Sequence, residues 1–193
     1  MQKPLIVGLG GTPRRGSTAN CALTIALGKV ADLGAETVMF DGPFLAELPH
    51  FDPEGSDRTA KQTELVETVG RADGMIIATP AYHGGVSALV KNGLDLLEDL
   101  RARERVYLDN MAVGTIVTAY GNQGIGVVLT ALRGIVHTLR GWPTPFGAGF
   151  NSLESPFDKE GNCTSEAIQG QLELVGSQVY EFAMMQQLKR ESA

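Results

Sequence analysis

The apolar residues of this chain gather into short uninterrupted runs, which alternate with longer stretches of helical periodicity. The runs at residues 5–10, 74–79 and 113–119 predict buried β-strands, because strands covered on both faces carry apolar residues without alternation. Residues 36–40 are predicted as another strand, and the Gly- and Pro-rich segment 142–150 is expected to hold a short fifth one.

Apolar residues spaced three or four apart predict a helix between successive strands. The clearest pattern runs from Val86 to Leu97, and the charged segment 98–105 closes it. Further helices are predicted to end near Gly34, to cover 59–72, to carry an apolar face over 128–139 and to cover 165–187. The segment 41–57 holds three of the nine prolines and is predicted to be a loop.

Strands and helices that alternate in this way predict a parallel sheet with helices on both faces. Five strands in 193 residues favour an α/β flavodoxin-like three-layer sandwich with a five-stranded parallel sheet in the order 2-1-3-4-5. The length predicts a single domain over residues 1–193.

The charge and the composition argue against several classes of binding partner and site. The formal net charge is −6, from 16 Lys and Arg against 22 Asp and Glu, so the chain lacks the broad positive field that nucleic acid or an anionic membrane requires. No apolar run approaches the roughly 20 residues that span a bilayer. The sequence begins directly in a predicted strand rather than in a secretory signal, so a cytoplasmic location is expected. Cys21 and Cys163 are too few for a disulfide scaffold and lack metal-ligand spacing.

Much of the glycine falls in three loops that follow predicted strands. Ligands of doubly wound sheets bind beyond the carboxyl ends of the strands, where the strand order switches, so these loops are the expected binding site. The glycines are Gly10, Gly11 and Gly16 in the first loop, Gly84 and Gly85 in the second, and Gly121, Gly124 and Gly126 in the third.

The first loop has the features of a phosphate cradle. Ser17 and Thr18 stand where a helix begins, and the free N–H groups there attract an anion together with Arg14 and Arg15. An ordinary helix cap beside exposed arginines is the alternative. Pro13 stands where a dinucleotide fingerprint needs its third glycine, and Ser17 stands where a P-loop needs lysine. The loop therefore suits a single terminal phosphate.

The segment GTPRRGSTAN resembles the G-S-x-R-x-x-S-x-N phosphate loop of the NAD(P)H-dependent FMN reductases, and ATPAYHGGVSALVKNGLDLL resembles their T-P-x-Y segment. AYGNQGIGVVLTALR occupies the position of their third, glycine-containing loop, so the resemblance covers about residues 1–150. It implies a flavodoxin-like fold that holds FMN and an enzyme that transfers hydride from NADPH or NADH to the flavin. It also implies a homodimer or a homotetramer, and an acceptor such as free flavin, a quinone, an azo compound or a metal oxyanion.

The loops and the resemblance together define the expected cofactor-binding residues. Arg14, Ser17 and Asn20 are expected to hold the phosphate, with Thr12 in place of the usual serine, and His83 stands where the family often has asparagine. The full set is Thr12, Arg14, Ser17, Thr18, Asn20, Pro80, Ala81, Tyr82, His83, Gly84, Gly121, Asn122 and Gln123.

No protein side chain is expected to be catalytic, because the cofactor carries a hydride transfer. No metal site is expected, because the three histidines are far apart in the sequence. Two alternatives stay open at this point. One is a flavodoxin-type electron carrier, which binds FMN without oxidising NADPH, and the other is a regulatory domain that has kept the fold without the cofactor.

Overall fold

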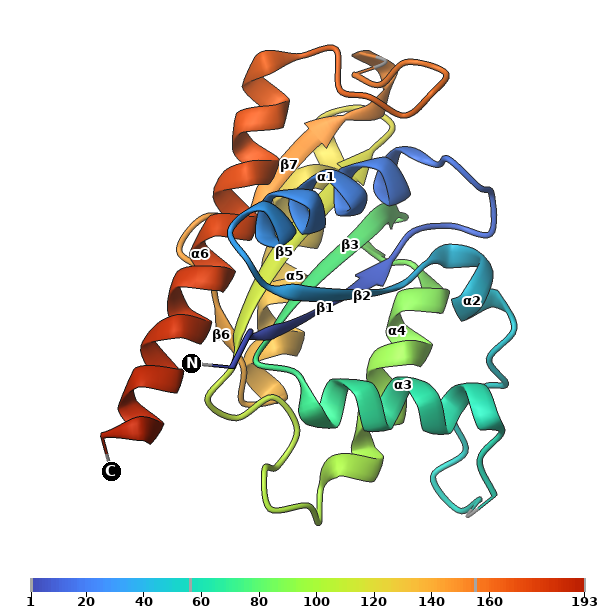
Figure 1. The fold of residues 1–193 in the computed structure, drawn as a ribbon. Helices are drawn as coiled ribbons and strands as arrows, with labels where there is room; N and C mark the ends of the chain where they lie inside the picture. The colour runs from blue at the N-terminus through green and yellow to red at the C-terminus, as the bar shows by residue number, and fades with distance from the viewer. Residues whose placement is uncertain (1, 56, 155, 193) are drawn as a thin grey trace.

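A twisted parallel sheet forms the centre of the molecule, as the computed structural model of residues 2–55, 57–154 and 156–192 describes it (Figure 1). The strands stand in the order β2-β1-β3-β5-β6. Their bounds are β1 Leu5–Gly10, β2 Glu36–Phe40, β3 Gly74–Tyr82, β5 Ala112–Ala119 and β6 Trp142–Pro143. The expected order of second, first, third, fourth and fifth strand is confirmed, and so is the flavodoxin-like α/β fold.

The prediction of five strands is wrong, because the described residues form a sheet of seven. The fifth strand is divided into β6 and β7 (Ala148–Asn151), which both pair in parallel with β5. Pro145 lies in the gap between them, and a proline cannot donate a ladder hydrogen bond. The other additional strand is β4 (Gly85–Val86), which folds back antiparallel on the end of β3.

Helices cover both faces of the sheet, and each face has its own apolar core (Figure 1). On one face lie α1 (Thr18–Asp32) and α6 (Glu166–Glu191), which pack against side chains such as Ile6 and Ile76. The other face carries α3 (Ala60–Arg71), α4 (Ala88–Asp95) and α5 (Gln123–Thr138), with Val7 and Ile77 in the core. Successive strand residues enter opposite cores because side chains alternate across a strand.

Two expectations about helices differ from the structure. The predicted loop 41–57 contains the short helix α2 (Gly42–Ala46), because the Asp41 side chain accepts a hydrogen bond from Phe44 N at 2.9 Å. The helix predicted through Leu97 ends as an α-helix at Asp95 and tightens into the 3₁₀ helix η1 (Leu96–Leu100). A second 3₁₀ helix, η2 (Ser152–Glu154), follows β7.

The third strand extends beyond the predicted Thr79 to Tyr82, because it pairs with β4. The turn between β3 and β4 consists of His83 and Gly84, with φ of 51° and 80°. Two left-handed residues give the turn a twist that matches the strands on either side.

Candidate functional site

The three glycine-containing loops lie together at the carboxyl edge of the sheet, because β1, β3 and β5 are neighbouring parallel strands. Gly11 N donates to Ala78 O at 3.1 Å and ties the first loop to β3. A Cβ on Gly124 would lie 3.5 Å from the Cβ of Ala81, so the third loop contacts the second. The edge is therefore one continuous surface.

Glycine at two positions of the first loop is a steric requirement. Gly11 has a φ of +108°, and a Cβ there would lie 1.5 Å from Asn20 Oδ1. A Cβ on Gly10 would lie 2.0 Å from Ala78 O. These two glycines therefore let the loop pack directly against Ala78 of β3 and Asn20 of α1.

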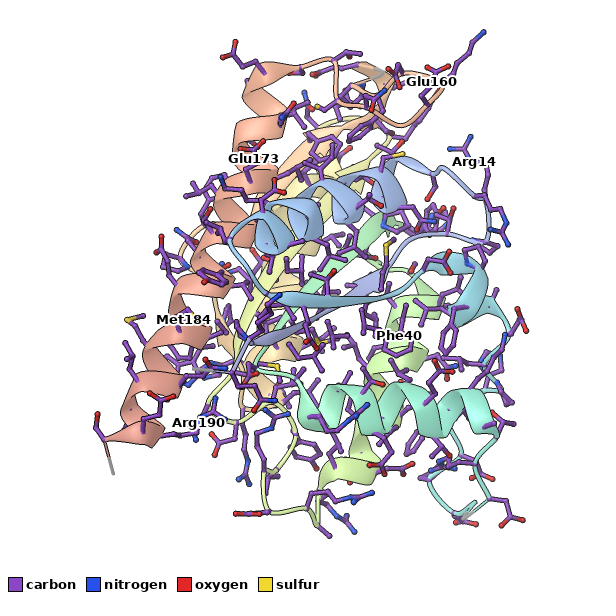
Figure 2. The ribbon with its side chains drawn as sticks, viewed as in Figure 1. Arg14, Phe40, Glu160, Glu173, Met184 and Arg190 are labelled. Atoms are coloured by element: carbon purple, nitrogen blue, oxygen red, sulfur yellow. The ribbon has the colours of Figure 1, made fainter. Side chains whose placement is uncertain are left out.

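Ser17 begins α1 directly behind this loop. Its side chain is 2% exposed, and its Oγ accepts a hydrogen bond from Asn20 N at 3.3 Å. The first turn of α1 holds no acidic residue, so nothing in that turn opposes an anion at the helix N-terminus. Arg14 is exposed on the loop, where Figure 2 labels it, and Thr18 is half-buried. Thr12 Oγ1 donates to Arg14 O at 3.5 Å, near the limit of a hydrogen bond.

Asn20 lies behind the loop rather than on its open side. The residue is 7% exposed, and its Oδ1 is buried without a hydrogen-bond partner in the described part of the chain. The capped start of α1, with the exposed Arg14 beside it and no acidic residue in its first turn, fits a phosphate group held by free N–H groups.

The second loop is held firmly at its base and exposed at its tip. Thr79 Oγ1 donates to Pro80 O at 3.0 Å and accepts from Ser87 N at 2.9 Å. Pro80 is buried and Ala81 is half-buried. The exposed tip consists of Tyr82, His83 and Gly84, and Tyr82 is 54% exposed.

The third loop is anchored by a residue outside the predicted set. Gly121 N donates to Asn151 Oδ1 at 2.9 Å, which joins the loop to the end of β7. Gly121 has a φ of +102°, and Asn122 and Gln123 are exposed beside it. Tyr120 is 85% exposed at the same edge. Sequence reasoning missed Asn151 because its partner is 30 residues away, and no local signal marks that pairing.

The first loop is buttressed by the turn after β2, which sequence reasoning also missed. Gly42 is buried against the loop, where a Cβ would lie 1.8 Å from Thr12 O. The segment that follows α2 is held by Asn92, whose Oδ1 accepts from Phe51 N at 2.8 Å and whose Nδ2 donates to Pro49 O at 3.0 Å.

Neither a metal cluster nor a reactive thiol accompanies these loops. Within the described residues, no three His, Cys, Asp or Glu side chains gather to hold a metal ion. Burial raises the pKa of the Cys21 thiol, so this group is protonated at neutral pH. No helix in the described ranges is long and apolar enough to cross a membrane.

Comparison with known proteins places residues 4–151 within the sequence model of the NADPH-dependent FMN reductases. Over 134 residues the chain is 30% identical to an FMN reductase (NADPH) of Escherichia coli (strain K12). The matched segment covers 66% of each of the two chains. Over 97 residues it is 36% identical to an NADPH azoreductase of Bacillus sp. (strain OY1-2), which covers 48% of this chain and 49% of that one. The matched part thus spans about half to two thirds of these relatives.

Solved structures share the fold at low sequence identity. FerB, a flavoenzyme NAD(P)H:(acceptor) oxidoreductase from Paracoccus denitrificans, superposes with a TM-score of 0.73 at 16% identity, over 93% of this chain and 98% of that chain. A flavodoxin of Streptococcus pneumonia TIGR4 superposes with a TM-score of 0.61 at 13% identity, over 92% of this chain and 98% of that chain. Enzymes and carriers therefore share this architecture, and the fold alone does not separate them.

Proposed function

We propose that this chain, which belongs to the NADPH-dependent FMN reductase family, is an FMN-binding oxidoreductase that oxidises NADPH or NADH and reduces a small-molecule acceptor. The observation that carries the proposal is the first loop. The exposed Gly16, the capped start of α1 and the exposed Arg14 form a cradle that suits one phosphate. The match of residues 4–151 supports membership of the family. The activity is inferred from the first loop.

Two groups of residues would hold FMN in a single domain. The phosphate would lie on the first loop, and the flavin ring would lie against the second and third loops, which contact each other. The residues of the first group are Thr12, Arg14, Ser17, Thr18 and Asn20, and those of the second are Pro80, Ala81, Tyr82, His83, Gly84, Gly121, Asn122 and Gln123.

Bound FMN would supply the redox chemistry, since the cofactor carries the hydride transfer. The protein's part is to hold the phosphate, to orient the ring and to leave one face of it open. The rigid base of the second loop suits the orienting role, because Thr79 fixes it with two hydrogen bonds. The exposed Tyr82 is placed to stack on a flat ring.

If both substrates use the same open flavin face, the kinetics will be ping-pong. Parallel lines in double-reciprocal plots would support this mechanism, and intersecting lines would contradict it. The acceptor class includes free flavin, quinones and azo compounds.

We also propose a homodimer or a homotetramer. Tyr82, Tyr120 and Val127 are large apolar side chains exposed near the same edge, which suits a surface that another subunit or a substrate covers. Light scattering coupled to size-exclusion chromatography measures the assembly, and a monomer at micromolar concentration would contradict it.

The deciding experiment is an anaerobic visible spectrum of the purified protein with FMN, before and after NADPH or NADH. Bound-flavin bands that bleach would support a reductase. Bound flavin that stays yellow would contradict the enzyme and favour an electron carrier. Absence of flavin binding would favour a regulatory domain without the cofactor.

A further inference from the structure

The third loop of the site has little side-chain packing to hold it in place. Tyr120 is 85% exposed, and Asn122 and Gln123 are exposed as well. A Cβ on Gly121 would meet nothing within 4 Å. In the described part of the chain, α5 begins without a side-chain hydrogen bond at its cap. Neither side-chain packing nor a helix cap therefore fixes the position of this loop.

Hydrogen bonds from the end of β7 hold the loop instead. The parallel pairing of β5 with β7 ends at Ala119 and Asn151 (Figure 1). Just beyond this pair, Asn151 Oδ1 accepts from Gly121 N at 2.9 Å, and Ser152 Oγ donates to Ala119 O at 3.0 Å. The same Oδ1 also accepts from Leu153 N at 3.0 Å, which orients the amide group. Two side chains thus continue the contact between the strands after the backbone pairing stops.

Of these two side chains, Asn151 is the one that reaches the loop itself. Ser152 bonds to the last residue of β5, before the loop begins. Asn151 bonds to Gly121, whose φ of +102° belongs to the turn that leads into α5. The side chain of Asn151 acts on the loop only as an acceptor in these bonds, so loss of its oxygen would release the turn.

A released third loop would change the surface that it shares with the second loop. A Cβ on Gly124 would lie 3.5 Å from the Cβ of Ala81, so the two loops are in contact there. The hydrogen bonds of Asn151 reach the third loop and its own segment, whereas the proposed phosphate cradle belongs to the first loop. Their loss is therefore expected to affect the ring end of a bound flavin and to spare the phosphate end.

We propose that Asn151 is a positioning residue of the flavin site, which holds the third loop against the ring through Gly121 N. The inference rests on the proposed function, because the ring is that of the FMN placed at these loops. It deepens that function by assigning the placement of the ring and the binding of the phosphate to separate parts of the chain.

The first test uses the protein without flavin. Replacement Asn151→Leu removes the acceptor at similar side-chain size, whereas Asn151→Asp keeps an oxygen that accepts from both N–H groups. Amide hydrogen exchange of Gly121 should accelerate roughly tenfold in the leucine variant, because its hydrogen bond is lost, and should stay native in the aspartate variant. If the leucine variant does not fold, Asn151→Ala takes its place in the same measurements.

The second test adds FMN. In the leucine variant the FMN dissociation constant from a fluorescence titration should rise roughly three- to tenfold, and the visible bands of the bound flavin should move towards those of free flavin. The aspartate variant should restore the native bands. Inorganic phosphate, used as a competitor of FMN, should keep its native inhibition constant in all variants. A general loosening of the edge would weaken phosphate as well.

The matched control is Glu154→Gln, which changes an exposed side chain of the same segment and keeps Asn151 and Ser152. It should leave the exchange rate, the FMN affinity and the bands unchanged. Native exchange of Gly121 in the leucine variant, native FMN affinity together with native bands, or an equal loss of FMN and phosphate binding would overturn the inference.

The two proposals can fail separately. A native chain that binds no FMN would overturn the reductase, while the exchange of Gly121 would still decide whether Asn151 holds the third loop. A native chain whose bound flavin bleaches with NADPH or NADH, beside a leucine variant with native exchange, affinity and bands, would overturn the role of Asn151 and leave the reductase standing.

Discussion

The position of the first loop is expected to depend on Gly42, a residue outside that loop. Replacement Gly42→Ala would place a Cβ 1.8 Å from Thr12 O, whereas real Cβ atoms essentially never come closer than 3.0 Å. The turn after β2 and the first loop must therefore separate by at least the difference of these distances, about 1.2 Å. The neighbouring atoms at 2.3 and 2.5 Å are also backbone atoms of Thr12, so no side-chain rotation relieves the overlap.

A displacement of this size exceeds the tolerance of a hydrogen bond between a backbone N–H group and a phosphate, which spans only about 0.5 Å in donor–acceptor distance. Loss of one or two charge-assisted hydrogen bonds, each of about 1.5–3 kcal/mol, should weaken FMN binding by at least roughly tenfold. The overlap itself should cost about 1–3 kcal/mol of unfolding free energy, which leaves a domain of ordinary stability folded.

The assay is a titration of FMN fluorescence at constant protein concentration, with a urea denaturation curve for each variant. The matched control is Gly28→Ala, on the exposed side of α1, where an added Cβ meets nothing within 4 Å. The control should gain about 0.5–1 kcal/mol of stability from helix propensity and keep the native FMN affinity. A folded Gly42→Ala protein with native FMN affinity would refute the reasoning.

Three further predictions concern other parts of the molecule. The double variant Arg14→Ala with Ser17→Ala should lose at least roughly tenfold in FMN affinity, because it removes charge-assisted phosphate contacts and the cap of α1, and an unchanged fluorescence titration would show that the phosphate lies elsewhere. Asn92→Ala should lower the unfolding free energy by about 1–3 kcal/mol in urea, because it leaves Phe51 N without its acceptor, and a loss below a few tenths would contradict the role of this amide. The pKa of Asp158 is lowered by hydrogen bonds from Asn162, so its contribution to the 158–162 turn is present above the ordinary pKa of an aspartate and is lost as the pH falls through the lowered value. Amide exchange of Asn162 should therefore accelerate in strong acid and not between pH 5 and 8, and acceleration in the neutral range would contradict the assignment.

The pattern of the sequence determined the layers of this fold and the edge at which its loops meet. Buried parallel strands are apolar throughout and helices are apolar on one side, so the strand order and the two helical layers were predictable. Ser17 was predictable as the start of α1, because its hydroxyl is a good helix cap and this effect spans only three residues.

Other features needed the tertiary structure because they depend on contacts between distant segments. The antiparallel strand β4 is only two residues long and depends on the turn at His83 and Gly84, so it leaves no periodicity to detect. The fifth strand is divided because β6 and β7 pair with two separate parts of β5, which no local pattern shows.

The residues that support the loops of the site also depend on contacts between distant segments. Gly42 and Asn151 contact loops that are 30 residues away in the sequence, and neither belongs to a local motif. A cavity beside α1 is formed by three segments, and one of them lies more than 100 residues after the other two. Local hydrogen bonds and periodicity depend on residues that are close in the sequence. A cavity exists only where separate segments pack, so its shape and its charge are properties of the folded chain alone.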